Sequence, residues 1–515
     1  MEAARALGGQ GPSDQGDGGR ALHEDGQVMT LSDARGVVAE LARAVTSSSH
    51  DARTSDRQML EAYDSRTWLL LDEAARTFSY AAAAAVTGRE RWLEADLAEP
   101  TGVVAAITSF HTDGHIRQRA TRALADRGGT LPARALALRL LDHVPQVRAE
   151  AHGALLPTLG LSDAGAVLGV LLAGRGRQDA PSATSAVRDV LLRRSSVEDL
   201  VEALVQSDDR LVRRWAFSQA HDQQVLTAER LLDVVRSDPD QQLRATAVEW
   251  LLPVASTEQQ RELVTARSVE ARLAAVTYLP DDVLVDSDLM PLLLDRAARV
   301  REQARWRAHR RGIATATYYR DRMGDAKTGS HALAASLDGL AATGSTDDLR
   351  VFIDHLGHPG AAVRTAALTG LSLHGQAGLV LDALETALLD PSPRVSATAA
   401  RALVRLKAPP SRAEAAWESP QSWTRRAAWR TSRGGGSWDR VEADLRAAAD
   451  SDPQVAALGR SGVQNWLSTS AATTWARLSD EQQQRIQTLL ASRSVGDAST
   501  LAVAFHARIQ LQPAG

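Results

Sequence analysis

The chain has 515 residues, of which 44% are hydrophobic but only 4% aromatic, so its apolar content is mainly Ala, Leu and Val, a composition that favours helices. Its formal net charge of −4 excludes a globally basic nucleic-acid binder, although a local basic stripe is compatible with it. The absence of cysteine excludes disulfides, thiolate metal sites and a cysteine nucleophile.

The amino-terminal region predicts a tail followed by a helical cap. Residues 1–30 are rich in Gly, Asp and Gln and lack the apolar segment of an export signal, so we expect a disordered tail on a cytoplasmic protein that binds no membrane. Residues 31–100 predict the cap. There, LSDARGVVAELARAV predicts a helix with Ser32 as its N-cap, and a polar break, TSSSHDARTSDR, precedes the helical segment MLEAYDSRTWLLLDEAARTF.

A short pattern recurs beyond residue 100. Each copy has a turn containing Asp or Pro, then an apolar residue, an Arg and, three positions after the Arg, a small residue. Seven copies keep the Arg, namely Arg117, Arg148, Arg213, Arg244, Arg272, Arg301 and Arg364. Three later copies, aligned on Val395, Trp423 and Val455, have other residues in its place. With degenerate copies near residues 179 and 332 the period is about 31 residues, which indicates a repeat architecture.

Each repeat predicts a helical hairpin. In HPGAAVRTAALTGLSLHGQAGLVLDALETALLD, apolar residues follow helical spacing to about Leu373 and, after a glycine-containing turn, again to Leu389, and no strands are predicted. Such a hairpin buries its apolar flanks only by stacking on its neighbours. We therefore predict an all-α fold, a right-handed α-α superhelix of about twelve hairpins. It is regular over residues 101–410 and irregular, rich in Trp and Arg and ending in a cap, over residues 411–515.

The recurring D-P-x-x-x-V-R-x-x-A-x-x-A-L signature resembles HEAT repeats, particularly the short subclass first noted in phycobilisome lyase-like proteins. The resemblance covers about residues 100–470 and implies an armadillo-like α solenoid. It implies no single function, because HEAT families include adaptors, chaperone-like factors, lyases and DNA glycosylases. The sequence departs from the signature after residue 395, where the Arg disappears and Trp residues accumulate.

The motif residues are expected to have structural tasks. Aspartates in the turns can accept hydrogen bonds from the unpaired N–H groups that open the next helix. The repeated Arg can pair with an Asp of its own or the neighbouring turn, which predicts a ladder of ion pairs along the solenoid. The turn aspartates are Asp113, Asp209, Asp238, Asp390 and Asp452.

The sequence contains no motif for catalysis. It has no phosphate-binding Gly-rich loop, no zinc-protease motif and no nucleophile elbow, and Gly434–Gly436 predict a flexible loop. The pairs His111/His115 and His355/His358 have helical spacing, but no further ligand completes a metal set. We therefore expect a protein that is not an enzyme and has no catalytic residue, metal or cofactor.

Two clusters of Arg and aromatic residues are candidate partner-binding sites. In RAARVREQARWRAHRRG, residues 296–312, helical spacing directs Val300, Ala304 and Ala308 inward and leaves the arginines on the flanks and the outer face. The second cluster, residues 417–438, holds four of the eleven Trp residues. The candidate residues are Arg301, Arg305, Trp306, Arg307, Arg310, Arg311, Tyr318, Tyr319, Arg320, Trp423, Arg425, Arg426, Trp429 and Arg430. One alternative for each cluster stays open. The arginines of the first cluster can form a solvated face while Trp306 packs between repeats, and the tryptophans of the second cluster can fill an irregular core.

Two functions remain. The first is a scaffold or adaptor that binds a protein partner on the solenoid surface, because exposed Trp and Arg are typical anchors of interfaces. The second is a nucleic-acid-binding or repair protein similar to HEAT-like DNA glycosylases, which the clustered arginines favour and the negative net charge disfavours. A lyase acting on a chromophore or modified residue ranks last.

Overall fold

The structure is a computed structural model that describes residues 21–22, 28–45, 50–76, 102–125, 127–325 and 327–510. Most of the predicted tail, and residues 77–100 of the predicted cap, lie outside these ranges. The chain divides into two compact units, residues 1–254 and 255–515.

In its described residues, the first unit is helical apart from one small strand pair. The strands β1 (Ala21–Leu22) and β2 (Val28–Met29) are antiparallel, and they are the exception, within the described ranges, to the prediction of no strands. The helices of the first unit are α1 (Leu31–Val45), α2 (His50–Ala62), α3 (Ser65–Arg76), α6 (Gly102–Thr108), α7 (Gly114–Leu124), α8 (Thr130–Leu140), α9 (Pro145–Leu155), α10 (Leu161–Ala173), α11 (Ala180–Arg194), α12 (Val197–Val205), α13 (Arg210–Asp222), α14 (Ala228–Ser237) and α15 (Gln241–Leu251).

The start of α1 differs from the predicted one. Thr30, and not Ser32, caps the helix, because Thr30 Oγ1 accepts a hydrogen bond from the backbone N–H of Asp33 at 3.2 Å. The Asp33 carboxylate in turn accepts from the backbone N–H of Thr30 at 2.8 Å, which completes a capping box. The predicted polar break is also shorter than expected, since α2 already begins at His50.

The second unit continues the succession of helices. They are α16 (Thr257–Thr265), α17 (Val269–Tyr278), α18 (Asp286–Leu292), α19 (Ala298–Arg310), α20 (Thr315–Gly324), α21 (Ser330–Thr343), α22 (Leu349–Asp354), α23 (Ala361–His374), α24 (Ala377–Leu388), α25 (Pro393–Arg405), α26 (Glu414–Trp417), α27 (Ser422–Ser432), α28 (Ser437–Ala448), α29 (Pro453–Thr469), α30 (Asp480–Ala491) and α31 (Asp497–Ala507). Short 3-10 helices, η1 (Thr346–Asp348), η2 (Pro410–Ala413) and η3 (Ala471–Thr473), lie between them.

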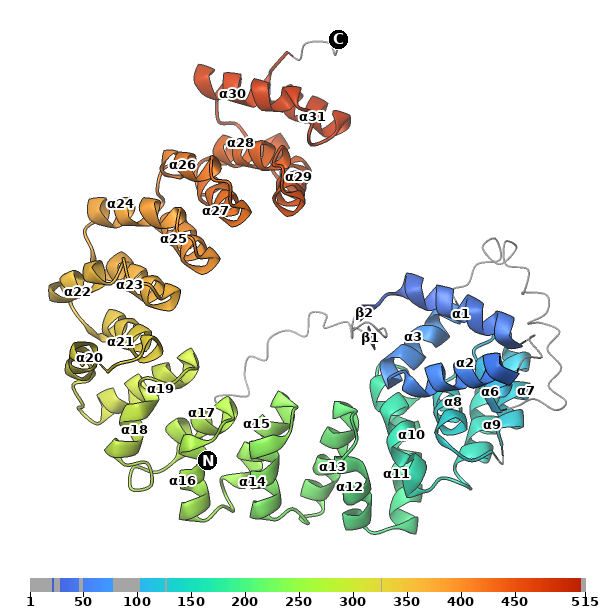
Figure 1. The fold of residues 1–515 in the computed structure, drawn as a ribbon. Coiled ribbons are helices and arrows are strands. Elements are labelled where there is room, and N and C mark those ends of the chain that lie inside the picture. The colour runs from blue at the N-terminus through green and yellow to red at the C-terminus, as the bar shows by residue number, and fades with distance from the viewer. Residues whose placement is uncertain are drawn as a thin grey trace. The chain divides into compact units, whose positions relative to one another are not determined.

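The helices form an all-α solenoid of stacked hairpins, as predicted. We call the odd-numbered helices from α7 to α29 the motif helices, because they occupy the repeat position of the Arg pattern, and the even-numbered helices after them the partner helices. In the second unit the motif helices line one side and the partner helices the other (Figure 1), and consecutive motif helices pack on one another, as in α21 on α23 and α25 on α27. Helices α11 and α21 occupy the two gaps in the period near residues 179 and 332.

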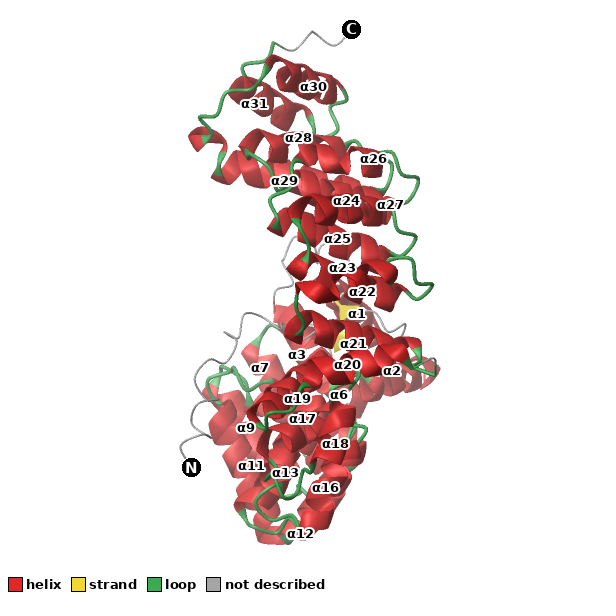
Figure 2. Cartoon of the chain, turned by 90° about the vertical axis from the view of Figure 1, so that its left-hand side faces the viewer, coloured by secondary structure: helices red, strands yellow, loops and turns green. Residues whose placement is uncertain are grey.

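The composition explains why this stack forms. Ala and Leu dominate the buried positions of both units, and such residues let helices pack closely while they favour helical backbone. The best-formed repeat gives α23 and α24, which end within a residue of the predicted positions. Figure 2 shows that the described residues are otherwise helices joined by short loops, and none of these helices is long and apolar enough to cross a membrane.

Candidate partner-binding surfaces

The repeated Arg forms the predicted ladder of ion pairs. Arg364 donates from Nε and Nη2 to the two carboxylate oxygens of Asp390, at 2.8 and 2.7 Å, and from Nη1 to the carbonyls of His358 and Pro359. Each such pair ties a motif helix to the turn after the next partner helix. The same bidentate arrangement occurs in Arg117–Asp142, Arg213–Asp238, Arg272–Asp295 and Arg425–Asp450.

The turn aspartates divide into two kinds. Asp113, Asp209 and Asp452 cap α7, α13 and α29 through their side chains, as predicted. Asp238 and Asp390 also accept one backbone N–H at the start of the next helix, but from two residues before its N-cap, and each accepts the ladder Arg as well.

Arg425 corrects the prediction that the Arg disappears after residue 395. The alignment on Trp423 assigns Thr424 to the Arg position. In the structure Thr424 fills the buried apolar position, Arg425 forms the ladder pair, and Ala428, fully buried, is the small residue three positions later. The error of one residue arose because Trp423 is the more obvious apolar residue, and the ladder therefore continues into the region of Trp residues.

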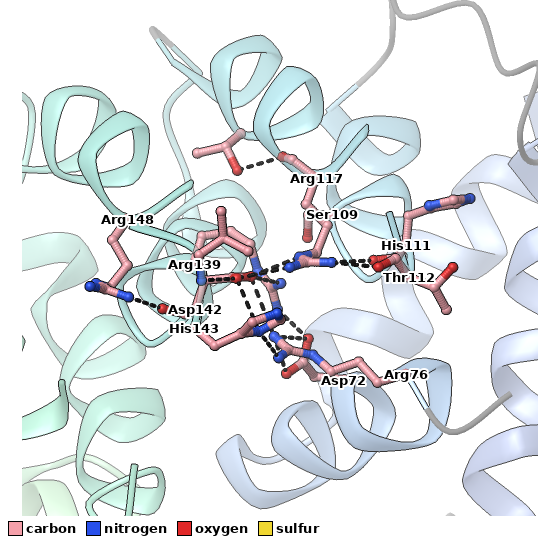
Figure 3. A network of polar contacts seen from close by, with 12 residues as sticks. Asp72, Arg76, Ser109, His111, Thr112, Arg117, Arg139, Asp142, His143 and Arg148 are labelled. Carbon is pink, nitrogen blue, oxygen red and sulfur yellow. Dashed lines mark hydrogen bonds and ion pairs between the residues drawn. The ribbon is translucent and has the colours of Figure 1, made fainter. Parts of the chain in front are cut away.

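A buried network of charged side chains joins α3 to the first repeats (Figure 3). Asp72 and Asp142 are 0% exposed, and the Arg139 guanidinium pairs with both of them. Burial alone would raise the pKa of Asp72, but the charges of the surrounding arginines outweigh it and lower that pKa. Carboxylates that stay ionised and that solvent does not reach are poor general acids or bases, so the network is structural. Its arginines are Arg76, Arg117, Arg139 and Arg177.

Most arginines of the first predicted cluster pair with acidic residues of the chain itself. Arg307 was expected on the flank or outer face of its helix, but it is 8% exposed. It donates to the carbonyls of Val276 and Leu279 and to Asp281. Hydrogen bonds from Arg311 and Arg307 lower the pKa of Asp281 to about 2. The other pairs are Arg301–Asp338, Arg305–Asp338, Arg311–Asp286 and Arg320–Asp348.

The two tyrosines of this cluster differ in exposure. Tyr319 is 0% exposed and its ring lies against Gly339, where a Cβ atom would come within 2.1 Å of it, so only glycine fits there. Burial raises the pKa of the Tyr319 hydroxyl to about 12. Tyr318 is half-buried, with the Arg322 guanidinium 5.5 Å from its ring centre. Tyr319 is therefore a core residue and no partner reaches it.

What remains of the first cluster is a short stripe on α19. Val300, Ala304 and Ala308 are 0% exposed, as predicted, so the core positions of this helix are filled without Trp306. Trp306 is 51% exposed, and the Arg310 guanidinium lies 4.9 Å from its ring centre. Packing between repeats thus accounts for only part of the Trp306 surface. We call Arg299, Trp306 and Arg310, which follow one line of the helix at i, i+7 and i+11, the Trp306 stripe.

In the second cluster the tryptophans mostly fill the core, which was the alternative left open. Trp417, Trp429 and Trp438 are buried, and Trp429 Nε1 donates to the Asp444 carboxylate at 2.8 Å. Trp423 is partly buried. Tryptophan accumulation here is therefore mainly a feature of packing.

Two arginines of the second cluster stay unpaired. Arg426 and Arg430 on α27 reach solvent and form no ion pair with any residue of the described ranges, whereas Arg425, directly before Arg426, belongs to the ladder. Sequence reasoning also missed similar arginines on α25 and α29, namely Arg394, Arg401, Arg405 and Arg460. These arginines could have been identified from the lack of acidic residues near them in the repeats, and not from the local density of arginines.

Within the described ranges, no three His, Asp or Glu side chains lie close enough to hold a metal ion. The His355 and His358 rings are stacked with centres 6.5 Å apart, and His355 Nδ1 lies 2.7 Å from the carbonyl of Val351. A cavity of about 730 Å³ beside α13 is lined by Arg214 and Asp240, which pair with each other.

Comparison with known proteins gives distant likeness in fold only. No family model matches the chain, and no curated protein matches it. The chain is similar to importin beta crystallised in an ammonium sulfate condition, with 12% identity and a TM-score of 0.38 over 92% of this chain and 72% of that one. It is also similar to Kap121p bound to Nup53p and to Kap121p bound to the extreme C-terminus of the protein phosphatase Cdc14p, with 14% identity to each. Those TM-scores are 0.25 and 0.26, over 93% of this chain and 51% and 52% of the others. The chain thus spans about half the length of Kap121p, and at these scores the likeness says nothing about what it binds.

Proposed function

We propose that the chain is a non-enzymatic scaffold or adaptor that binds a protein partner on the motif-helix surface of its second unit. The Trp306 stripe carries this proposal. Half of the Trp306 surface is exposed, Arg310 covers part of its ring, and neither Arg299 nor Arg310 pairs with an acidic residue of the described chain. Trp and Arg together are the residue types that dominate binding energy at protein interfaces.

Four further predictions from the sequence are part of this proposal. The repeats belong to the short HEAT subclass, the regular solenoid spans residues 101–410, the protein is cytoplasmic and it needs no cofactor. Of the predicted site residues, the ones that remain at least partly available to a partner are Trp306, Arg310, Tyr318, Trp423, Arg426 and Arg430, because the others are buried or paired. Stacked repeats support such a role, because they present an extended surface on which several weak contacts add up.

The test compares a site variant with a matched control. Trp306→Ala with Arg310→Ala removes two of the three residues of the Trp306 stripe. Trp475→Ala with Arg477→Ala removes the same residue types elsewhere in the second unit, where Trp475 is even more exposed than Trp306. Each tagged full chain is purified from its native lysate with and without nuclease, and the accompanying proteins are quantified by mass spectrometry. We expect a nuclease-resistant set of proteins that the first variant depletes and the second does not.

Two results would contradict the proposal. If nuclease releases everything that accompanies the chain, the nucleic-acid alternative replaces it. If both variants retain the same proteins in the same amounts, the Trp306 stripe is not the binding surface.

A further inference from the structure

The last four motif helices differ in charge from those between α9 and α21, whereas α7 resembles the last four in having no acidic residue. Every motif helix from α9 to α21 contains at least one Asp or Glu, as in Glu270 of α17 and Glu302 of α19. Helices α23, α25, α27 and α29 contain none. The only charged residues on these four helices, histidine apart, are arginines.

Six of those arginines have no acidic partner. Arg364 and Arg425 belong to the ladder, and the rest form what we call the arginine face: Arg394, Arg401, Arg405, Arg426, Arg430 and Arg460. Five of the six are exposed and Arg430 is partly exposed. The one hydrogen bond from their guanidinium groups to another described residue runs from Arg401 to the neutral hydroxyl of Thr398, at 3.0 Å.

The arginines lie on one surface. Arg394, Arg401 and Arg405 are spaced i, i+7 and i+11 along α25, so they follow a single line of that helix. Arg401 and Arg430 occupy the same repeat position, five residues after the ladder position, on α25 and α27, which pack against each other. Helix α27 packs in turn on α29, which carries Arg460. Helices α25 and α27 therefore present unpaired arginines at equivalent positions, and the next motif helix carries one more exposed arginine.

Most acidic residues of this region lie on the partner helices or directly after them. There they pair with other arginines, in Arg412–Asp382, Arg412–Glu385, Arg446–Glu414, Arg446–Glu418 and Arg485–Glu442. The two layers thus differ in charge. The partner helices carry acidic residues that pair with most of the arginines there, Arg440 excepted, whereas the motif helices carry arginines and no acidic residue. No acidic side chain of the described residues neutralises the arginine face.

We propose that the arginine face binds an acidic, extended segment of a protein partner. This inference rests on the proposed function, because it names the chemistry of a partner segment that such a scaffold would take. Helix axes in contact lie about 10 Å apart, so crossing from α25 to α29 takes about 20 Å, the length of about six extended residues. In an extended chain every second side chain points the same way, which lets carboxylates meet guanidinium groups in bidentate pairs.

The observations favour an acidic polypeptide over a nucleic acid. Of the tryptophans on these helices, Trp429 and Trp466 are buried and Trp423 is partly buried, so the face offers no row of exposed rings on which successive bases could stack. The face is also small, and the chain as a whole carries a net charge of −4, which repels a long polyanion. A short acidic segment meets the arginines without extending over the acidic parts of the surface.

The experiment measures binding of three probes to the full chain by fluorescence anisotropy. The probes are a labelled peptide of about twelve residues with Glu at every second position, the same peptide with Gln for Glu, and a mixed-sequence DNA duplex. The test variant is Arg401→Glu with Arg430→Glu. The control, Arg119→Glu with Arg193→Glu, makes the same charge change at exposed helical arginines of the first unit that also lack a partner. Circular dichroism verifies that both variants fold.

We expect the Glu peptide to bind and the Gln peptide not to bind. The test variant should weaken Glu-peptide binding by about tenfold or more, and the control by less than about twofold, because only the first removes close charge pairs. The inference is overturned if the Glu peptide binds the two variants equally, or if it does not bind the parent chain. In either case the Trp306 experiment still tests the proposed function separately. Tighter binding of the duplex than of the Glu peptide, abolished by the test variant, would replace the acidic segment with a nucleic acid.

Discussion

The two arginine-rich regions of the second unit use the same side chain in opposite ways. Residues 296–322 have the higher density of arginines in the sequence, but acidic residues of the same unit pair with most of them, as Asp281 does with both Arg307 and Arg311. The arginines of α25, α27 and α29 are sparser, but six of them have no such partner. Availability to a partner is therefore decided by where the acidic residues lie.

Position within the repeat explains the difference. An arginine in the ladder position reaches the Asp after the next partner helix, wherever the repeat supplies one. An arginine on the outward line of a motif helix has no carboxylate within reach unless a neighbouring element supplies it. A count of charges along the sequence cannot distinguish these two situations, because partners 23 to 37 residues apart meet only in the folded stack.

The largest effect is expected in the buried network of the first unit. Asp142→Asn leaves Arg117 and Arg139 buried with one carboxylate fewer, which should cost about 3–5 kcal/mol of local stability. Hydrogen exchange of α8 and α9, followed by mass spectrometry, measures this loss. The control Glu150→Gln breaks a pair with Arg122, whose side chain is 65% exposed, and should cost less than about 1 kcal/mol. Equal exchange in the two variants would refute the structural role of the network.

Neighbouring residues of α19 provide the next contrast. Arg307→Ala leaves the carbonyls of Val276 and Leu279 without their donor and should destabilise the region by about 2–3 kcal/mol. Trp306→Ala should cost about 1 kcal/mol or less, because half of that side chain is already in solvent. Hydrogen exchange of α17 and α19 distinguishes them, and the reverse order of the two losses would place Trp306 in the core.

Much of the fold could be predicted from the sequence, and the reasons are local. The period, the hairpins and the ladder follow from Ala, Leu and Arg at fixed spacing, and the inward residues of α19 follow from helical geometry. The N-cap of α1 was wrong by two residues, because Thr30 and Ser32 are both good caps and only the reciprocal bond to Asp33 decides between them. The alignment at Arg425 was wrong by one residue, because size and hydrophobicity made Trp423 the better candidate.

The candidate site could be predicted only in part. Trp306 and Arg310 are exposed and unpaired. Arg301, Arg305 and Arg320 instead form ion pairs with aspartates of elements farther along the chain, which the sequence did not reveal. The arginine face could not be predicted from the sequence, because its residues are dispersed over three repeats. Only their common position on stacked helices brings them together.

Asp444 gives a prediction about pH. Burial raises the pKa of Asp444 to about 6, although hydrogen bonding to Trp429 and the charge of Arg433 oppose the shift. The folded chain therefore holds a proton on Asp444 between about pH 4 and 6 where the unfolded chain does not, so this group stabilises the fold at low pH and loses that contribution as pH rises through about 6. The effect is on the order of 2 kcal/mol.

The measurement is the protection of α28 and α29 amides between pH 4.5 and pH 7.5, corrected for intrinsic exchange. Asp444→Asn keeps the side chain size and an acceptor for Trp429 but cannot titrate, so it serves as the control. We expect protection in the parent chain to fall with rising pH relative to the variant. The same profile in both, or the opposite sign, would show that Asp444 is ionised throughout this range.

The smallest stability effect is expected at the arginine face. Arg426→Gln should change stability by less than about 0.5 kcal/mol, because an exposed side chain with no partner is removed. Arg425→Gln, one residue away, breaks the bidentate pair with Asp450 and two bonds to the carbonyls of Ser419 and Pro420, and should cost about 2 kcal/mol. Thermal unfolding of the two variants tests this directly.

The most direct test of the central claim measures both stability and binding for the Arg426→Gln variant. Arg426→Gln and the parent chain are compared for thermal stability and for affinity to the Glu-containing peptide at the same salt concentration. If unpaired arginines are the ones available to a partner, Arg426→Gln lowers the affinity by about twofold to fivefold and leaves the unfolding temperature unchanged. An unchanged affinity together with a lower unfolding temperature would contradict the account, because Arg426 would then serve the fold and not a partner.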